Sequence, residues 1–319
     1  AIRFATAGSE RLRISSSGFV GVGTANPVRK LHVADDNSEI MLVQSGNASG
    51  SYINYKLGAN GAELGMLGSG AAILSGGADA ADFGIRSSGD LCFSSGGHAE
   101  RARFDTSGRL LLGLTSARSV GDVTSISQIE GTSFANSSLS LMANAGASAG
   151  NQVHITLGKS RGTSDGSSTV VASGDGLGLI QWAGADGTDC NTVAAKIHAF
   201  VDGTPGSNDM PGRIGFYTTP DGASSPTERM RIDNQGRALF NTTVNDPADD
   251  GGSSNTGTTI SEDGYVSSSR SAGASGKFGR VDNDGIIVNL YQDGTAEGNI
   301  SVSGSTVSYN GGHLSRWSQ

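Results

Sequence analysis

Residues 228–236 read Glu228-Arg229-Met230-Arg231-Ile232-Asp233-Asn234-Gln235-Gly236, and this stretch decides the fold. The pattern occurs twice more, in Glu10-Arg11-Leu12-Arg13-Ile14-Ser15-Ser16-Ser17-Gly18 and in Glu100-Arg101-Ala102-Arg103-Phe104-Asp105-Thr106-Ser107-Gly108. In each copy a glycine follows the glutamate by eight positions, and a short apolar run comes next. A phenylalanine precedes each copy, at Phe4, Phe93 and Phe216. The chain therefore uses one structural unit three times.

The physical reading of this unit is a β-hairpin. Side chains alternate along a strand, so the pattern predicts that the glutamate shares a face with the apolar residues while both arginines share the other face. The polar triplet closed by glycine predicts a type I turn with one left-handed residue, and an aspartate or serine at its start can bond the turn backbone. A looser fourth turn is predicted at Val281-Asp282-Asn283-Asp284-Gly285-Ile286. We expect the repeat residues to fix the register between neighbouring strands or neighbouring chains. These residues are Glu10, Arg11, Arg13, Gly18, Glu100, Arg101, Arg103, Gly108, Glu228, Arg229, Arg231 and Gly236.

The rest of the chain also favours strands. No window of 12 residues keeps an apolar helical stripe free of glycine, and Gly/Asp/Ser turns recur every 8–15 residues, which is the spacing of all-β proteins. We therefore predict an all-β fold. Outside the repeats, strands are expected at 153–157, 178–182, 194–201, 212–217, 285–290, 299–303 and 306–309.

The repeats also suggest how the chain is divided, because copies 90 and 128 residues apart end modules rather than form a tight solenoid. We expect the end of a preceding repeat at 1–33, one β module at 34–115, a larger one at 116–244 and a Gly/Ser-rich C-terminal β shaft at 245–319. The chain begins at Ala1 without a methionine or signal peptide, so we expect a fragment or the ordered part of a longer protein.

Composition points to a core that is shared between copies. Glycine supplies 50 of the 319 residues and aromatic residues only 6%, too few large apolar side chains for a self-sufficient globule of this length. Three chains wrapped about an axis would bury the thin strands and hide their edges, which predicts a homotrimer. The net charge of −8 argues against duplex nucleic acid as a partner, and no apolar stretch approaches the length of a membrane span.

Chemical motifs are weak. The cysteines, Cys92 and Cys190, lie too far apart for a metal motif and are expected to be buried, and the histidines never come at ligand spacing, so we predict no metal and no cofactor. On the predicted strands, His154 and His198 alternate with apolar residues and are expected to be packed or to lie on the axis of the assembly, with an axial metal ion as the alternative. Most of the acidic residues that stand out lie in Asp-Gly turns, and no carboxylate pair suggests a glycosidase, so we predict no enzyme and no catalytic residue.

The repeats resemble those of bacteriophage tail fibre and tailspike proteins. The resemblance rests on Thr227 to Ile232 with Gly236, on Gly18 to Pro27 with Lys30 to Val33, and on the glycine-rich loops of 150–244. The stretch from Asp293 to Asn310 is similar to the segment that precedes the self-cleaving intramolecular chaperone of such fibres. The resemblance implies an elongated, intertwined homotrimer of β-sandwich or β-prism modules with a thin triple-stranded shaft. It also implies a hypothetical cleavage junction near the C-terminus.

The function that this resemblance implies is adhesion to the host cell surface by an extracellular virion tail fibre. The expected partners are further copies of the chain, tail, baseplate or adaptor proteins, and a bacterial surface glycan such as lipopolysaccharide or an outer-membrane receptor, without nucleic acid. Three alternatives stay open: a purely structural shaft, a tailspike depolymerase acting as hydrolase or lyase, and a bacterial adhesin or capsid appendage. Aromatic rings stack on sugars, so the candidate receptor-binding residues are Trp182, Tyr217, Tyr52, Tyr55, Tyr291 and Trp317.

Overall fold

The computed structural model describes residues 1–34, 52–57, 62–69, 74, 82–144, 146, 150, 152–249 and 255–311. Nearly all regular structure within these ranges is β-strand, and the one helical element is a 3₁₀ turn at Phe134–Asn136. The predicted all-β fold is therefore confirmed. The chain divides into two units: one comprises Ala1–Arg118 and Ser125–Ser140, the other Ser119–Thr124 and Leu141–Gln319.

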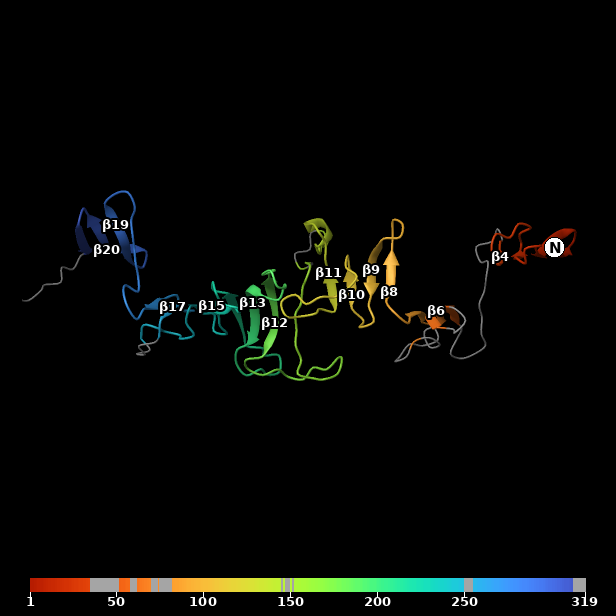
Figure 1. The fold of residues 1–319 in the computed structure, drawn as a ribbon. Coiled ribbons are helices and arrows are strands. Elements are labelled where there is room, and N and C mark those ends of the chain that lie inside the picture. The colour runs from red at the N-terminus through yellow and green to blue at the C-terminus, as the bar shows by residue number, and fades with distance from the viewer. Residues whose placement is uncertain are drawn as a thin grey trace, which may run out of the picture. The chain divides into compact units, whose positions relative to one another are not determined.

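The described residues of the first unit form three sheets, in each of which neighbouring strands follow one another in the chain (Figure 1). Strands β3 and β4 pair in parallel, as do β10 and β11, and the other pairs are antiparallel. The strands are β1 (Ile2–Thr6), β2 (Ser9–Ile14), β3 (Val20–Val22) and β4 (Leu31–Val33); β5 (Tyr52–Leu57), β6 (Ala62–Ser69) and β7 (Phe83–Ser87); and β8 (Leu91–Ser94), β9 (Glu100–Phe104), β10 (Leu110–Leu112) and β11 (Ser127–Ile129).

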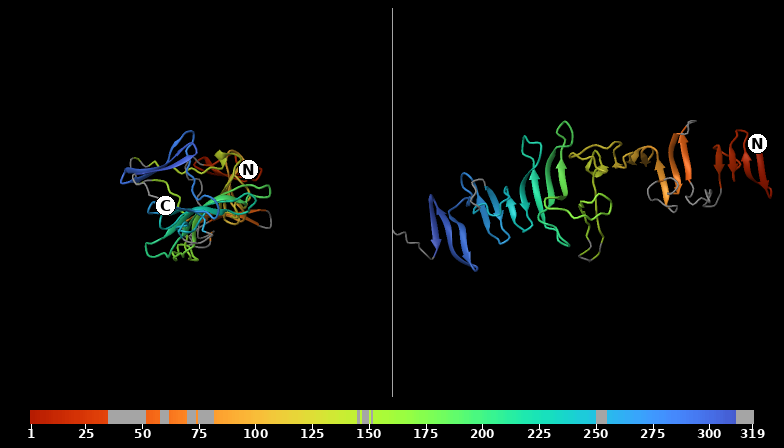
Figure 2. Two further views of the ribbon diagram at one scale, coloured as in Figure 1. Left: turned by 90° about the vertical axis from the view of Figure 1, so that its left-hand side faces the viewer. Right: turned by 90° about the horizontal axis from the view of Figure 1, so that it is seen from below.

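The second unit holds a seven-stranded antiparallel sheet and a three-stranded one (Figure 2). Every neighbouring pair is antiparallel, so each sheet is a simple meander. The strands are β12 (Gly176–Ala183), β13 (Val193–Val201), β14 (Gly212–Thr218), β15 (Thr227–Ile232), β16 (Ala238–Phe240), β17 (Gly257–Ile260) and β18 (Val266–Ser269), then β19 (Gly285–Gln292), β20 (Thr295–Ser303) and β21 (Thr306–Gly311). All the strands predicted outside the repeats are present except 153–157.

The three sequence repeats form the same turn. The amide of the closing glycine donates to the carbonyl oxygen of the residue three before it, at 3.0, 2.8 and 3.1 Å in the three copies. Gly18, Gly108 and Gly236 have φ of 75°, 77° and 88°, a conformation that L side chains resist. Asp233 also accepts the backbone amide of Arg237 at 3.0 Å and its side-chain Nε at 2.8 Å, and Asp105 does the same for Arg109. The predicted turn chemistry is confirmed.

The strands that enter these turns differ from the prediction in one respect. Each contains a β-bulge: Phe4 pairs with Leu12 while Ala5 pairs with Glu10, so Arg11 has no partner in the register. The other two copies carry the same bulge at Arg101 and Arg229. One extra residue reverses the alternation. The glutamate therefore lies on the same face as the second arginine, and the prediction that it shares a face with the apolar residues is wrong.

Two further predictions are corrected. Residues 281–286 form no hairpin, since Gly285 opens β19 after a long connection from β18. A fourth copy of the turn lies instead between β17 and β18, where the amide of Gly264 donates to the Ser261 carbonyl oxygen at 3.0 Å. Residues 153–157 form no strand, and all five are exposed.

Side-chain burial is thin within the described residues. The buried hydrophobic residues are Leu111, Val171, Val201 and Leu239. Leu239 pairs with Arg231 on one side and with Thr259 on the other, so the buried row lies on the arginine face of the seven-stranded sheet. The loop after β16 covers this face, because the hydroxyl of Thr259 donates to the Val244 carbonyl oxygen at 3.0 Å. No helix among these residues has the length and hydropathy of a membrane span.

Candidate functional site

The opposite face of the seven-stranded sheet is apolar and open. Cross-strand pairing places five large side chains in one row and four more, with two alanines, in a neighbouring row. Several remain 37–66% exposed, among them Ile180, Ile214, Phe240 and Val266. The first row is Ile180, Ile197, Phe216, Met230 and Phe240; the second is Ala199, Ile214, Ile232, Ala238, Ile260 and Val266. We call this surface the apolar face.

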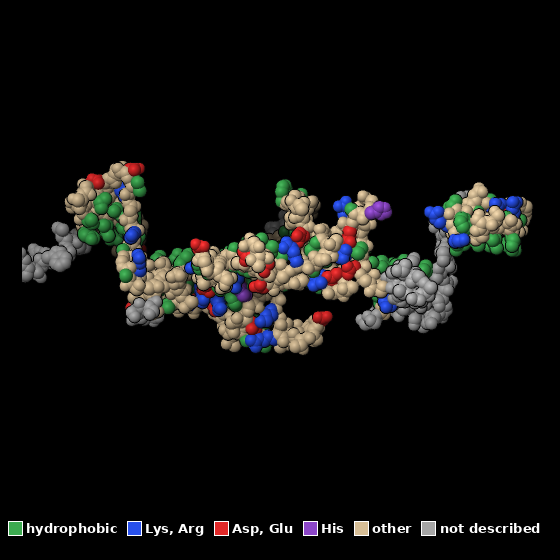
Figure 3. Space-filling view, viewed as in Figure 1, with side chains coloured by type: hydrophobic (Ala, Val, Ile, Leu, Met, Phe, Trp, Pro, Cys, Tyr) green, Lys and Arg blue, Asp and Glu red, His purple; other side chains and the backbone are tan. Residues whose placement is uncertain are grey.

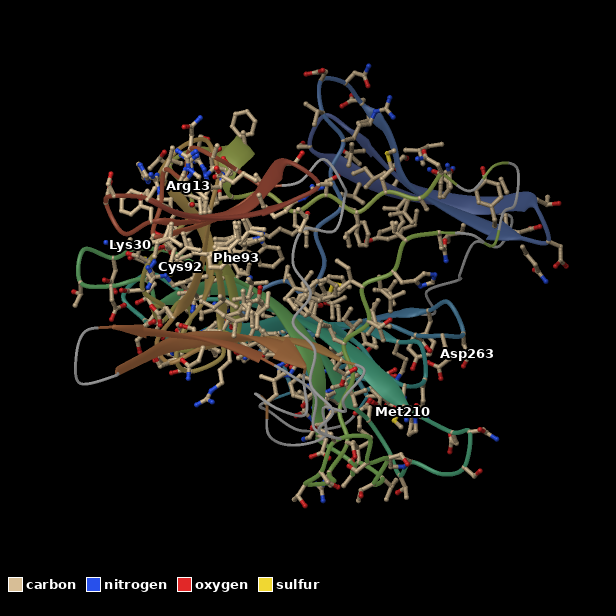
Figure 4. All side chains as sticks on the ribbon, turned by 90° about the vertical axis from the view of Figure 1, so that its right-hand side faces the viewer. Arg13, Lys30, Cys92, Phe93, Met210 and Asp263 are labelled. Atoms are coloured by element: carbon tan, nitrogen blue, oxygen red, sulfur yellow. The ribbon has the colours of Figure 1, made fainter. Side chains whose placement is uncertain are left out.

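The sheets of the other repeats repeat this arrangement. In the first, Ile2 pairs with Ile14 and Phe4 with Leu12, and both Ile2 and Phe4 are more than half exposed. In the sheet of β8 to β11, Phe93 pairs with Ala102 and is 45% exposed. Figure 4 labels Phe93 and the residue before it in β8, Cys92. The three phenylalanines that precede the sequence repeats thus occupy the same register position on the apolar side of their sheets.

The C-terminal sheet has an apolar side and an amide side. Val288, Ile300 and Tyr309 form one cross-strand row, whereas Asn289, Asn299 and Asn310 form another on the other side. The amide of Asn310 donates to Oδ1 of Asn299 at 2.9 Å, which ties the second row together. Hydrophobic side chains gather on this sheet in Figure 3.

The seven-stranded sheet is covered on one face only. Thr259 on its arginine face is fully buried beneath the loop after β16, whereas Ile180, Phe240 and Val266 on its apolar face are 55%, 40% and 66% exposed. The chain thus covers the more polar face of its largest sheet with its own loops and leaves the more apolar one open.

The arginine faces carry partly buried ion pairs that the bulges create. Nη2 of Arg13, Arg103 and Arg231 lies 2.8, 2.7 and 3.0 Å from Oε2 of the glutamate three residues earlier, and Nε of each arginine completes a bidentate contact. These arginines are only 15–18% exposed. Hydrogen bonding to Arg13 lowers the pKa of Glu10, and Arg103 does the same to Glu100. Arg103 also pairs with Asp90, a partner for which the sequence carries no signal.

The bulged arginines are held more loosely. Nε of Arg11 donates to the Thr6 hydroxyl and Nε of Arg229 to the Thr218 hydroxyl, each at 3.0 Å, and Arg101 reaches the Ser95 carbonyl oxygen. All three bulged arginines are exposed. Their partners all belong to the preceding strand or the residue that follows it, so the second arginine of each repeat makes the stronger structural contact.

In the third repeat, one aromatic ring and one further cation join the ion pair. The hydroxyl of Tyr217 donates to Oε2 of Glu228 at 2.8 Å, and the Lys196 ammonium lies 4.9 Å from the centroid of the Tyr217 ring. Burial, then the bond to Glu228 and its charge, raise the pKa of Tyr217 to about 12. This candidate glycan-binding ring is therefore half-buried, with its hydroxyl bonded to Glu228 and its face in contact with the Lys196 ammonium.

His198 lies beside this cluster. Its ring centroid is 3.8 Å from that of Phe200, whose other neighbour is the Arg213 guanidinium at 4.6 Å. Nδ1 of His198 is buried and makes no hydrogen bond among the described residues. Burial, followed by the charges of Lys196 and Arg213, lowers the pKa of His198 below 6.5. The packed histidine expected here is confirmed, whereas His154 is exposed.

This environment predicts a pH effect on stability. The unfolded chain binds a proton at His198 near pH 6.5, whereas the folded chain resists it until a lower pH, so stability is full above pH 6.5 and falls as the pH drops below it. We expect the melting temperature to fall further between pH 7.5 and pH 5.5 in the wild-type protein than in the His198→Gln variant. Differential scanning calorimetry at both pH values measures this, and equal losses in the two proteins would refute the effect.

A polar cavity of about 390 Å³ adjoins the third ion pair. Asn241, with a left-handed φ of 52°, closes the repeat beside it by donating its amide to the Arg229 carbonyl oxygen at 2.9 Å. In the first two repeats a glycine holds this position and the strand after the following loop pairs in parallel, whereas in the third repeat that strand, β17, pairs antiparallel. The lining residues are Glu228, Arg229, Arg231, Asn241, Thr242, Thr243, Val244, Asn255 and Thr256.

Of the predicted aromatic candidates, the three with described side chains do not converge on one site. Trp182 is 52% exposed and pairs with Ala195 on the apolar face, and Tyr291 is 64% exposed on β19. Tyr52 and Tyr55 lie in β5, but their side chains are outside the described part of the structure, as is all of Trp317.

The cysteines are less buried than expected. Cys92 is exposed on the outer strand β8, and Cys190 is half-buried in a loop. Within the residues described, no group of three or more histidine, cysteine or acidic side chains has an arrangement that could hold a metal ion.

The solved structures that resemble the chain include two forms of one tail fibre domain. No protein-family model and no curated protein matches the chain. The carboxy-terminal domain of the bacteriophage T5 L-shaped tail fibre is 15% identical with a TM-score of 0.37, over 76% of this chain and 90% of that one. The same domain with its intramolecular chaperone domain is 16% identical with a TM-score of 0.39, over 92% and 72% of the two chains.

Proposed function

We propose that this chain is a subunit of a bacteriophage tail fibre, in which three copies bury their apolar faces against one another. The observation that carries the proposal is the open apolar face of the seven-stranded sheet, because contiguous apolar rows exposed on a protein surface mark interfaces. The repeated bulge and ion pair support it further, since they stiffen each sheet on its covered side and leave the other side free. Glycine-rich strands of this kind are too thin to form a core alone.

Solution mass tests the assembly. Size-exclusion chromatography with light scattering is expected to give about 97 kDa, three times the chain mass of 32.2 kDa. A mass of 32.2 kDa at micromolar concentration would contradict the proposal, because the apolar faces would then be stable in water.

We further propose that the assembled fibre attaches the virion to a glycan on the host surface. The polar cavity beside Arg231 supports this, because its hydroxyl, amide and charged side chains are the groups that bond sugar hydroxyls. Three copies in a fibre turn weak individual sites into firm attachment. The attachment role separates this proposal from that of a purely structural shaft.

Binding to a panel of intact bacterial strains tests attachment. We expect binding to at least one strain, its loss after periodate oxidation of surface glycans, and its loss in Thr243→Trp, which fills the cavity. Thr188→Trp, on an exposed turn of another loop, is the matched control and should bind like wild type. Absence of binding to every strain would leave the structural shaft. Release of sugars from purified capsule or lipopolysaccharide would instead indicate a depolymerase.

A further inference from the structure

Residues 153–157 have the sequence of a strand but pair with no strand among the described residues. Val153, Ile155 and Leu157 alternate with His154 and Thr156, and the three apolar side chains are 50%, 73% and 52% exposed. From 152 to 160 no backbone group makes a hydrogen bond to another backbone group of the described chain. The segment thus has the alternating side chains of a strand without the pairing that a strand requires.

The C-terminal end of this segment is nevertheless held in place. Lys159 and Arg161 both pair with Asp175, the residue before β12, and Arg161 makes two hydrogen bonds to its carboxylate at 2.7 and 3.0 Å. These contacts lower the pKa of Asp175, Arg161 first. The segment is therefore anchored through Asp175 beside β12. This strand is the edge of the seven-stranded sheet, and its outer side pairs with no strand of the described chain.

Leu157 shows where the segment leads. A Cβ on Gly178 would lie 2.5 Å from Cβ of Leu157, so Leu157 fills the place of a side chain at that position. Gly178 pairs with Ala199 and shares the side of β12 that carries Ile180 and Trp182. Leu157 therefore packs on the apolar face at the edge strand β12, and the segment reaches that face through it.

We propose that residues 153–157 become a β-strand only in the assembled fibre, where they pair with and pack on a neighbouring copy of this chain. The inference rests on the proposed self-assembly and adds the element that joins the copies. A second copy is the occupant that fits, because the segment is continuous with the face through which copies are proposed to meet. The chain would then supply in trans the strand that its sequence predicts.

Hydrogen–deuterium exchange on the full chain, at a concentration where light scattering gives the trimer mass, tests the pairing. The amides of 153–157 are expected to exchange about 100-fold more slowly than their intrinsic rates. Exchange at intrinsic rates within a trimer would overturn this inference and leave the proposed fibre intact. A monomeric wild-type chain would overturn both, and slow exchange in a monomer would mean pairing within one chain and also overturn the inference.

A pair of variants tests the packing. Ile155→Asp places a charge on the apolar side of the proposed strand, and His154→Asp places the same charge on the other side. We expect Ile155→Asp to raise the concentration at which half the chains are assembled at least tenfold relative to His154→Asp. Equal assembly of the two variants would refute a strand packed by its apolar side.

Discussion

We expect the Ile180→Asp variant to behave as a single chain of 32.2 kDa under conditions where the wild type assembles. Ile180 is 55% exposed in one chain and lies beside Ile197 on the apolar face. A carboxylate there remains hydrated in the single chain but must lose its water when the face is covered, at a cost of several kcal/mol per buried ion. Three copies would each carry that cost, which exceeds what a local rearrangement can offset.

The neighbouring residue provides the matched control. Leu179 is 39% exposed, belongs to the same strand and pairs with His198 on the opposite side of the sheet. Leu179→Asp is expected to keep the wild-type mass in light scattering. If both variants dissociate, the effect is one of folding rather than of the apolar face; if neither does, the copies meet elsewhere.

The second large effect concerns Arg231. Replacement by alanine removes both hydrogen bonds to Glu228 and leaves a partly buried carboxylate whose remaining hydrogen bond within the described chain comes from Tyr217. Loss of a hydrogen bond to a charged group typically costs about 1.5–3 kcal/mol, so we expect about 2 kcal/mol less stability per chain. Thermal unfolding measures the change. Because Arg231 lines the cavity but its guanidinium is bonded to Glu228, cell binding measured where both proteins are folded should stay close to the wild-type level. Lost binding with unchanged stability would mean that Arg231, rather than the cavity's other polar groups, contacts the receptor.

Arg229 serves as the control for Arg231. It lies two residues away in the same strand, is exposed, and its side chain donates to the Thr218 hydroxyl. Arg229→Ala should change stability by only about 0.5 kcal/mol, as is usual for surface positions. Equal destabilisation by the two substitutions would contradict the distinction between the paired and the bulged arginine.

Much of the fold could be predicted from the sequence because its determinants are local. The turns at Gly18, Gly108 and Gly236 need only a left-handed residue and a polar side chain at the turn start, and both are visible in the sequence. The turn that begins at Ser261 follows the same rule and could have been found from its Ser-Glu-Asp-Gly pattern. The looser match at 281–286 was misleading because an Asp-Gly pair also occurs where a strand simply begins.

The candidate site was less predictable. The contact between Tyr217 and Glu228 joins neighbouring strands, and the Lys196 ammonium reaches the same ring from a third strand. The cavity beside Arg231 is lined by the loop between β16 and the antiparallel strand β17, whereas in the other repeats the corresponding loop leads to a parallel strand. Such groupings come from strand order and register, which single residue types do not encode.

By itself the sequence determined the all-β class, the hairpin turns and most strand positions, because each depends on backbone preferences and alternation within a few residues. Only the tertiary structure decided which face each side chain occupies. The bulge at Arg11, Arg101 and Arg229 arises when a strand pairs with its predecessor, and one extra residue reverses every side chain before it. The same holds for Val153 to Leu157, whose alternation predicts a strand, since a strand forms only where a partner supplies its hydrogen bonds.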